Sequence, residues 1–441
     1  MARILFIAYY FPPLGGPGTQ RSAKFVRDLT ALGHEVVVLT GPGTSTGRWD
    51  PPDATLGGDV PEGLRVHRVE GPVPGERGRA GRWLDRPSPF SRWWVAGATR
   101  VGRSLAGAAD VICASMAPYE TADAASAIAA SAGIPWVADL RDPWALDEMR
   151  VSPTRLHRRR DVARMRRALA TAATVVMNTP AAAAATSAAF PRLRAPVTSI
   201  PNGWDARDFT GDGPLAGERG PLRIVHTGSL HTELGLRQSS SGRLIHLVRG
   251  NEPVDILARS HVHLMEALRA VREQDPEAQI ELHLAGTLTD ADLRVADAPG
   301  VEIHGYLDHD ASVALVRSAD LLFLPMHDLP AGRRARLVPG KAYEYLASGR
   351  PLLAAVPDGD ARDLVGRFPD VHLCRPTDVP AMTAAIRTAA AAKARDGRTA
   401  DAPRPGLEAY ERSRLAQQLS DVLEACAAGA DRDQVAAGSS A

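Results

Sequence analysis

The stretch RLVPGKAYEYLASGRPLLAAVP, residues 336–357, joins a polar helix start to an apolar run. A Pro-Gly turn precedes Lys341 and Glu344, which lie three residues apart and therefore share one face of the predicted helix. The run that follows Arg350 is apolar without alternation, as is typical of a parallel strand that is covered on both sides. The stretch thus predicts a lysine and a glutamate at the mouth of a buried parallel sheet.

The same alternation of short apolar strands and helices extends over both halves of the chain. Helices are predicted over 19–32, 119–132 and 153–170. In the first half the predicted strands are RILFIAYY, HEVVVLT, ADVICAS, IPWVADL and ATVVMNT. In the second half they are LRIVHTGS, IELHLAG, VEIHGYL, DLLFLPM, PLLAAVP and VHLC. Strands that alternate with helices predict an α/β fold, with doubly wound, Rossmann-like parallel sheets.

The length of 441 residues fits two domains of roughly 200 residues each. We expect an N-terminal Rossmann-like domain over 1–202, a Gly/Pro/Asp-rich linker over 203–222, and a second Rossmann-like domain over 223–404. An amphipathic helix over 405–428 is expected to pack back on the N-terminal domain, and the polar tail 429–441 is expected to be disordered.

Composition excludes several classes of function. With 52 basic and 51 acidic residues the net charge is +1, so no global field favours nucleic acid. Cys113, Cys374 and Cys426 are widely spaced and form no CxxC pair, which argues against disulfides and thiolate metal sites and fits a cytoplasmic protein. The longest weakly polar region is interrupted by Asn178 and Pro180, so no membrane span is predicted.

A glycine-rich loop, FPPLGGPGTQR, follows the first predicted strand. Gly15 and Gly16 let the backbone approach a ligand, and the next helix start offers N–H groups to an anion. The dinucleotide fingerprint fails, because Arg21 stands where the third glycine belongs and no acidic residue ends the second strand. A nicotinamide or flavin dinucleotide is therefore disfavoured.

The second half has a corresponding loop, Gly228–Ser229, at the end of its first strand. Two such loops, one in each domain, would suit a diphosphate. A cation beside a helix start, such as Lys341, suits a phosphate, and the Glu344 carboxylate one turn further on can accept both hydroxyls of a ribose. These residues predict a nucleotide site in the second half.

The chain resembles the family 4 glycosyltransferases of the GT-B fold over nearly its whole length. The segments that carry the resemblance are YYFPPLGGPGTQRSAKFVRDLTALGHEVVVLT, WVADLRDPW, IPNGWD, HTGSL, HGYLDHDASVALVRSADLLFLP and PGKAYEYLASGRP, and their order and spacing matter more than any single one. The last segment is similar to a branch with a PxKxYEY pattern. The resemblance implies two domains facing across a cleft and hexosyl transfer with retention of anomeric configuration. It also implies a nucleoside-diphosphate sugar donor bound mainly by the C-terminal domain and a hydroxyl acceptor bound by the N-terminal domain.

The resemblance also implies roles for individual residues. Arg259 and Lys341 match the basic pair that neutralises the leaving diphosphate, while Arg141 and Asp142 match a position that faces the donor sugar. Donor-binding roles, with Glu344 on the ribose and Tyr306 against the nucleobase, fall on Gly15, Gly16, Gly228, Ser229, Tyr306, Pro339, Gly340 and Glu344. No cofactor and no essential metal are expected, because cationic side chains offset the charge of the departing nucleotide.

Two departures from the family pattern stand out. Arg336 occupies the position eight residues before Glu344 where the common motif has a second glutamate. The stretch 231–258 separates two segments that relatives join more tightly, so Arg237 or Arg243 could replace Arg259.

Several alternatives remain open at this level. Retention could proceed by front-face substitution, which we favour, or through a covalent intermediate on Asp139 or Asp142. A nucleotide-sugar epimerase and a non-catalytic nucleotide-sugar binder are alternatives on the same fold. The run RLHRRRDVARMRRAL carries seven arginines and could make weak peripheral contact with the inner face of a membrane. Saccharide, lipid-linked and specialised-metabolite acceptors are all compatible with the sequence, and His304 is expected to be structural.

Overall fold

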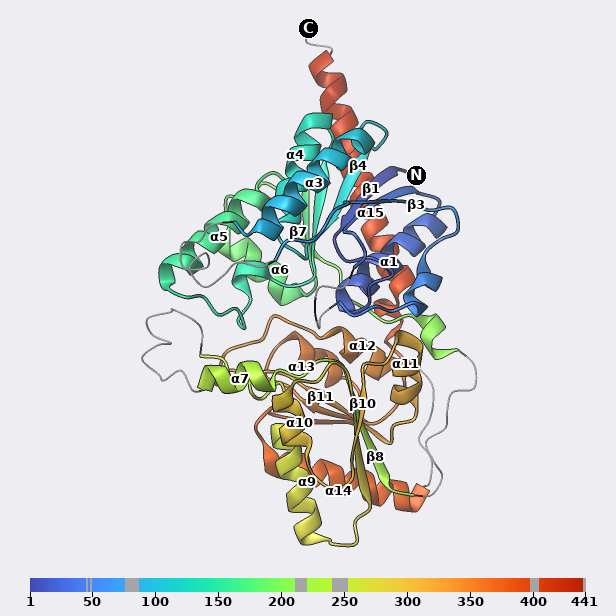
Figure 1. The fold of residues 1–441 in the computed structure, drawn as a ribbon, viewed down its shortest axis with the longest axis vertical. Helices are drawn as coiled ribbons and strands as arrows, with labels where there is room; N and C mark the ends of the chain where they lie inside the picture. Colours follow the sequence, from blue (N-terminus) through green and yellow to red (C-terminus); the bar gives the residue numbers. More distant parts are fainter. Residues whose placement is uncertain are drawn as a thin grey trace. The chain divides into compact units, whose positions relative to one another are not determined.

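The computed structural model describes residues 1–44, 47, 50–75, 87–210, 220–239, 253–396 and 404–438 of the chain. The chain forms two compact units, each built around its own parallel sheet (Figure 1). Unit 1 comprises Met1–Asn202 and Arg412–Ala441, and unit 2 comprises Gly203–Glu411.

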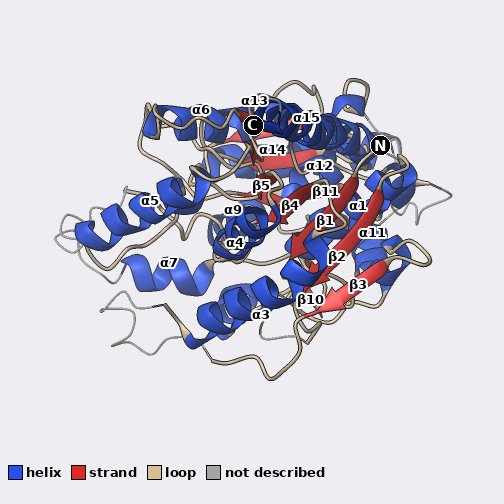
Figure 2. Ribbon diagram, turned by 90° about the horizontal axis from the view of Figure 1, so that it is seen from above, coloured by secondary structure: helices blue, strands red, loops and turns tan. Residues whose placement is uncertain are grey.

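Unit 1 contains a seven-stranded sheet in the order β3-β2-β1-β4-β5-β6-β7, and all its strand pairs are parallel. Figure 2 shows β1, β2 and β3 side by side, in agreement with their pairing. The strands are β1 (Arg3–Ala8), β2 (Glu35–Thr40), β3 (Arg65–Arg68), β4 (Val111–Ser115), β5 (Trp136–Leu140), β6 (Thr174–Met177) and β7 (Val197–Ser199).

Successive residues of the central strands enter two different cores, one on each face of the sheet. Leu5 and Ile7 of β1 pack on the face covered by α3 (Pro89–Ala106), α4 (Thr121–Ala132), α5 (Arg155–Leu169) and α6 (Pro180–Ala189). Ile4 and Phe6 pack on the opposite face, under α1 (Pro17–Ala31) and α15 (Arg412–Gly438). Burial on both faces explains the continuous apolar runs in the sequence.

The C-terminal helix α15 packs on unit 1. The His34 ring lies 2.7 Å from the Ser420 hydroxyl, and the N-terminal amine lies 2.6 Å from the Glu424 carboxylate. The helix begins at Arg412 rather than at residue 405, and it continues to Gly438. The expectation of a disordered tail from residue 429 is therefore wrong as far as Gly438, because the alanine-rich segment continues the helix; 439–441 lie outside the described residues.

Unit 2 contains a six-stranded parallel sheet in the order β10-β9-β8-β11-β12-β13. The strands are β8 (Leu222–Thr227), β9 (Ile280–Ala285), β10 (Val301–Gly305), β11 (Leu321–Pro325), β12 (Leu352–Ala355) and β13 (Val371–Cys374). Helices α9 (Val262–Gln274) and α14 (Val379–Asp396) cover one face. The remaining helices are α7 (Thr232–Ser239), α10 (Asp290–Ala296), α11 (His309–Arg317), α12 (Gly340–Ala347) and α13 (Asp360–Val365).

Both sheets reverse their strand order at one point, between β1 and β4 in unit 1 and between β8 and β11 in unit 2. In doubly wound sheets ligands bind at this switch point, beyond the carboxyl ends of the strands. A ligand-binding site is therefore expected at the loops that follow these four strands. No helix within the described parts of the chain is long and apolar enough to cross a membrane.

Strands β3 and β7 and helix α3 had no predicted counterpart. Of the predicted linker 203–222, residues 203–210 belong to unit 2, where the Trp204 indole N–H donates to Leu407 O at 3.0 Å. Residues 211–219 lie outside the described part. The described segments also contain four short 3₁₀ turns: Thr55–Asp59, Trp144–Leu146, Ala206–Phe209 and Glu408–Tyr410.

Candidate functional site

The loop after β8 and the helix α12 meet at the switch point of unit 2. Helix α12 begins at Gly340, directly after Pro339, as the Pro-Gly turn predicts. Within it, Lys341 and Tyr345 hold the same residue, Thr227, at the end of β8. The Lys341 ammonium donates to Thr227 O at 2.6 Å, and the Tyr345 hydroxyl accepts from Thr227 N at 2.8 Å. Helix α12 is thereby bonded to the end of β8 through both the amide and the carbonyl of Thr227.

Gly228 is constrained by its backbone conformation and by the end of the Lys341 side chain. Its φ of +105° lies in the region that favours glycine, and a Cβ atom would lie 2.6 Å from Lys341 Nζ. Gly286 repeats this pattern on the next strand, since its φ is +141° and a Cβ atom there would lie 2.6 Å from Gly228 O. The amide of Gly228 donates to Ala285 O and that of Gly286 to Gly305 O, both at 2.7 Å. The ends of β8, β9 and β10 thus form a compact backbone surface.

The surroundings of Lys341 shift its pKa strongly. Its pKa is lowered to about 7, first by burial and then by the positive charge of Arg259, while Glu344 acts in the opposite direction. His226 lies beside it, with its Nδ1 3.0 Å from Phe323 O and its Nε2 3.4 Å from Lys341 Nζ. Since a carbonyl only accepts, Nδ1 carries the proton and Nε2 is left to accept from Lys341. Burial and Lys341 both depress the pKa of His226, so it stays neutral.

Arg259 reaches this place through the backbone of the segment before α9. The amide of His231, two residues beyond Ser229, donates to Arg259 O at 3.0 Å. Arg259 is half-buried and close enough to depress the pKa of Lys341. Its alternative Arg237 forms an exposed ion pair with Glu233, and Arg243 lies outside the described residues.

Unit 2 therefore gathers several of the sequence-predicted residues at one place. Gly228, Ser229, Arg259, Gly340, Lys341 and Glu344 are all half-buried, whereas Pro339 is buried. Tyr306 follows Gly305 at the end of β10 and is 38% exposed. Arg336, in the segment that leads into α12, is half-buried. Arg259 depresses the pKa of Lys341, and an anion bound between the two would oppose this effect.

The switch-point loops of unit 1 bring a second set of predicted residues together. Gly16, with a φ of +88°, precedes the first turn of α1, and the Gly15 amide donates to Pro51 O at 2.6 Å. A Cβ on Gly18 would lie 3.0 Å from an Arg141 guanidinium nitrogen. Arg141 in turn donates to the Asp142 carboxylate at 3.0 Å. The start of α1 after β1 thus adjoins the Arg141–Asp142 pair after β5.

Asp139 has a different environment from Asp142. It is 1% exposed and forms a two-pronged ion pair with Arg21, with nitrogen–oxygen distances of 2.9 and 2.5 Å. Arg21 also donates to Ile200 O and Pro201 O, at 3.1 and 2.8 Å. Such a fully engaged carboxylate is poorly suited to attack a substrate, so Asp139 acts as a structural group rather than a nucleophile.

Three residues at these loops had not been singled out from the sequence. His226, on β8, contacts Lys341, and Tyr345, on α12, contacts Thr227 at the end of β8. Trp144 follows the Arg141–Asp142 pair with a φ of +50°, a strained conformation for a tryptophan. Its ring stacks on the ring of Tyr119, with 4.8 Å between the centroids and an angle of 1° between the ring planes. The DPW sequence marked the position of Trp144 but not its backbone conformation.

Both halves of the chain match models of glycosyl transferase families. Residues 15–203 match the model of the glycosyl transferase 4-like domain, and residues 257–391 match that of glycosyl transferases group 1. A search of curated protein sequences finds no match.

Solved structures share the fold over almost the whole chain. Alr3699/HepE of Anabaena, in complex with UDP and glucose, is 18% identical, with 96% of this chain and 100% of that chain covered and a TM-score of 0.60. Sucrose-phosphate synthase of Thermosynechococcus elongatus is 16% identical over 97% and 100%, with a TM-score of 0.62. A putative UDP-N-acetylglucosamine 2-epimerase of Listeria monocytogenes is 13% identical over 95% of each chain, with a TM-score of 0.52. At these identities the likeness concerns the fold.

Proposed function

The chain belongs to the family 4 glycosyltransferases, retaining enzymes of the GT-B fold that use a nucleotide-sugar donor, and we propose that unit 2 holds the donor diphosphate at its switch point. The observation that carries the proposal is that Lys341 and Arg259 are neighbours beside Gly228. Burial and the charge of Arg259 lower the pKa of Lys341 to about 7. An anion bound there would restore the charge of Lys341 and gain two charge-assisted contacts.

The proposed roles follow from the chemistry of the leaving group. As the bond between sugar and diphosphate breaks, negative charge grows on the departing phosphate, and Lys341 and Arg259 stabilise it. Gly228 has no side chain and lets the phosphates approach the backbone. Glu344, one helix turn after Gly340, accepts the ribose hydroxyls, and Tyr306 packs against the nucleobase.

Retention of configuration by front-face substitution fits the carboxylates of unit 1. A covalent intermediate needs a carboxylate that is available to attack the sugar. Asp139 is ion-paired with Arg21, and Asp142 is ion-paired with Arg141. We therefore assign Arg141 and Asp142 to orientation of the donor sugar rather than to nucleophilic attack.

For the donor base we propose uridine. The support is that Alr3699/HepE, of the same fold, was solved with UDP and glucose. An epimerase of the same fold is less well supported, since both family models that match this chain describe glycosyl transferases. The acceptor is a hydroxyl compound whose class the site does not define.

A panel of ligands tests the proposal by thermal unfolding of the full chain. We expect UDP to raise the unfolding temperature more than GDP, dTDP, ADP or NAD(H). At a hundred times its dissociation constant, UDP should add about 2.7 kcal/mol to the free energy of unfolding. The variant Glu344→Gln should reduce the shift, since it loses a charged acceptor for the ribose. A shift with NAD(H) alone, or with none of the ligands, would contradict a nucleotide-sugar site.

The pKa of Lys341 predicts a pH dependence of diphosphate binding. In the free protein Lys341 loses its proton near pH 7, and a bound diphosphate raises this pKa, so binding above pH 7 must take up a proton. The terminal phosphate loses its last proton near pH 6, below this range. Affinity for UDP should therefore fall by up to about tenfold per pH unit above pH 7.

Calorimetric titration in buffers of different ionisation enthalpy would measure the proton uptake directly. Lys341→Arg keeps its charge at every pH of the experiment and should abolish the pH dependence of UDP affinity.

The folding stability of the unliganded protein changes with pH in the opposite direction from the UDP affinity. The unfolded chain, with a lysine pKa of 10.5, binds more protons than the native state between pH 7 and 10.5, so the contribution of Lys341 to stability rises over that range. A UDP affinity that is constant from pH 6 to 9 would contradict the assignment of Lys341.

A further inference from the structure

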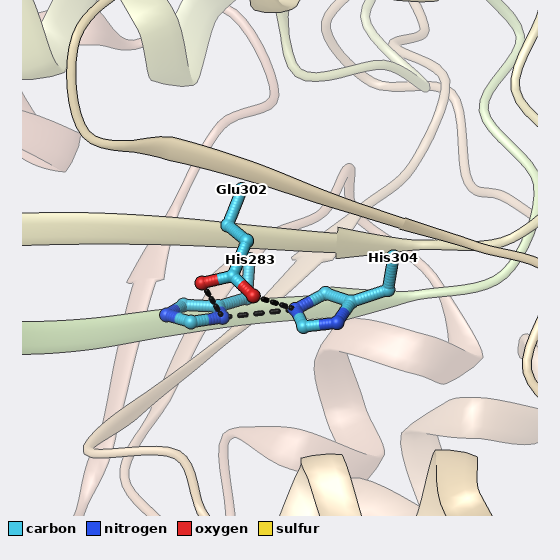
Figure 3. A group of neighbouring side chains, drawn as sticks. All are labelled: His283, Glu302 and His304. Carbon is cyan, nitrogen blue, oxygen red and sulfur yellow. Dashed lines mark hydrogen bonds and ion pairs between the residues drawn. The ribbon is translucent and has the colours of Figure 1, made fainter.

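Two histidines and a glutamate converge on the edge of the unit 2 sheet (Figure 3). His283 lies on β9, and Glu302 and His304 lie on the neighbouring strand β10. The register pairs Glu302 directly with His283. His304 lies at a register shift between Ile303 and Gly305, and its ring reaches His283 at 2.9 Å. Among the described residues this is the group of three or more His, Cys, Asp or Glu side chains whose ligand atoms converge.

The spacing of the three ligand atoms fits one metal ion. His283 Nδ1 lies 2.9 Å from His304 Nε2 and 3.4 Å from Glu302 Oε2, while His304 Nε2 lies 3.6 Å from Glu302 Oε1. Zinc binds nitrogen and oxygen at about 2.0 to 2.1 Å in a tetrahedron, whose edges are then about 3.3 to 3.4 Å. Figure 3 shows the Glu302 carboxylate beside the two facing ring nitrogens. The two ring nitrogens and the carboxylate are thus close enough to share one ion, with the two histidines facing different oxygens of Glu302.

Hydrogen bonding alone leaves this group incompletely satisfied. Two neutral rings can share one proton, which His304 Nε2 would donate to His283 Nδ1. His283 Nδ1 and the carboxylate of Glu302 are then both acceptors, 3.4 Å apart, with no donor between them. A cation in contact with all three atoms removes this conflict.

A second carboxylate lies where a zinc-binding histidine usually has one. The other ring nitrogen of His283, Nε2, lies 3.4 Å from Glu281 Oε2. Metal-ligating histidines commonly donate their remaining N–H to a carboxylate, which fixes the tautomer and the ring orientation. The nearby cation Arg223 opposes metal binding, but Glu281 and Glu302 together contribute two negative charges against one.

We propose that His283 Nδ1, His304 Nε2 and the Glu302 carboxylate bind a divalent zinc-type ion, with a fourth position open to water. Two imidazoles and one carboxylate suit zinc and its first-row neighbours rather than calcium or magnesium, which prefer oxygen ligands. No metal is expected for the proposed sugar transfer, so this ion would have another role.

The test is a titration of chelator-treated full-length protein with zinc chloride, followed by calorimetry. We expect one zinc ion per chain, and an affinity at least about 100-fold lower in His304→Ala and Glu302→Gln, since loss of a ligand should exceed the 10- to 100-fold cost of losing an outer-shell partner. Cobalt(II) substitution gives a second readout, because a tetrahedral site produces intense visible bands that both variants should lose.

The matched control is His263→Ala. His263 and Glu266 form a histidine–glutamate pair at 3.4 Å on α9, so this variant removes a comparable pair without touching the cluster. Its zinc affinity should equal that of the native protein. Glu302 is 60% exposed in its side chain, so Glu302→Gln should keep the thermal unfolding temperature of the metal-free protein. Absence of stoichiometric zinc in the native protein, or native affinity in the two cluster variants, would overturn the proposal.

Discussion

Replacement of Lys341 by alanine is expected to lower kcat by about 10² to 10³-fold, the range seen when one group that stabilises developing charge is removed. The reason is the position of its ammonium group, 2.6 Å from Thr227 O at the sheet switch point and close to Arg259. Without it, Arg259 alone would face the charge that grows on the departing diphosphate. The measurement is steady-state turnover with a UDP-sugar donor, after the panel has identified the base.

The folding stability of Lys341→Ala should change far less than its activity. The variant loses one hydrogen bond to Thr227 O, worth about 1 kcal/mol, but it also removes a buried cation whose low pKa reflects its unfavourable environment. Arg334→Ala is the control, since it removes a basic residue from an exposed ion pair with Asp363 in the segment before α12. Native turnover in Lys341→Ala, with both variants folded, would remove Lys341 from the proposed site.

The larger features of the fold could be predicted from the sequence because burial on both faces of a parallel sheet leaves continuous apolar runs. RILFIAYY and PLLAAVP are examples, and they correspond to β1 and β12. Strand β3, with the sequence RVHR, and strand β7, with VTS, lie at sheet edges and are only partly buried. Such short polar segments carry no pattern that separates them from loops.

The site could be predicted only where local sequence determines geometry. Gly228 and the Pro-Gly turn before Lys341 mark tight backbone and a helix start, and both occur in the structure. The bonds of Tyr345 to Thr227 join residues 118 positions apart, and no local pattern indicates them. The pairing of His283 with Glu302 likewise depends on the register of two strands, which sequence spacing alone does not fix.

The second large expected effect concerns the buried pair of Arg21 and Asp139. Asp139→Ala should lower the free energy of unfolding by about 3 to 5 kcal/mol, because it leaves the Arg21 guanidinium buried without its counter-ion. Both side chains are at most 3% exposed, and Arg21 also donates to Ile200 O and Pro201 O. The pair therefore ties α1 and β5 to the chain segment after β7. Urea unfolding at equilibrium, followed by circular dichroism, would measure the loss.

The double variant Arg21→Met/Asp139→Leu separates the buried charge from the packing, since it replaces both ions by apolar groups of similar size. It should recover most of the stability lost in Asp139→Ala, apart from about 1 kcal/mol for each carbonyl that loses its donor. Adduct trapping in the native enzyme tests the mechanism. A nucleophilic Asp139 could be trapped as a glycosyl adduct, whereas front-face substitution predicts no adduct on this residue.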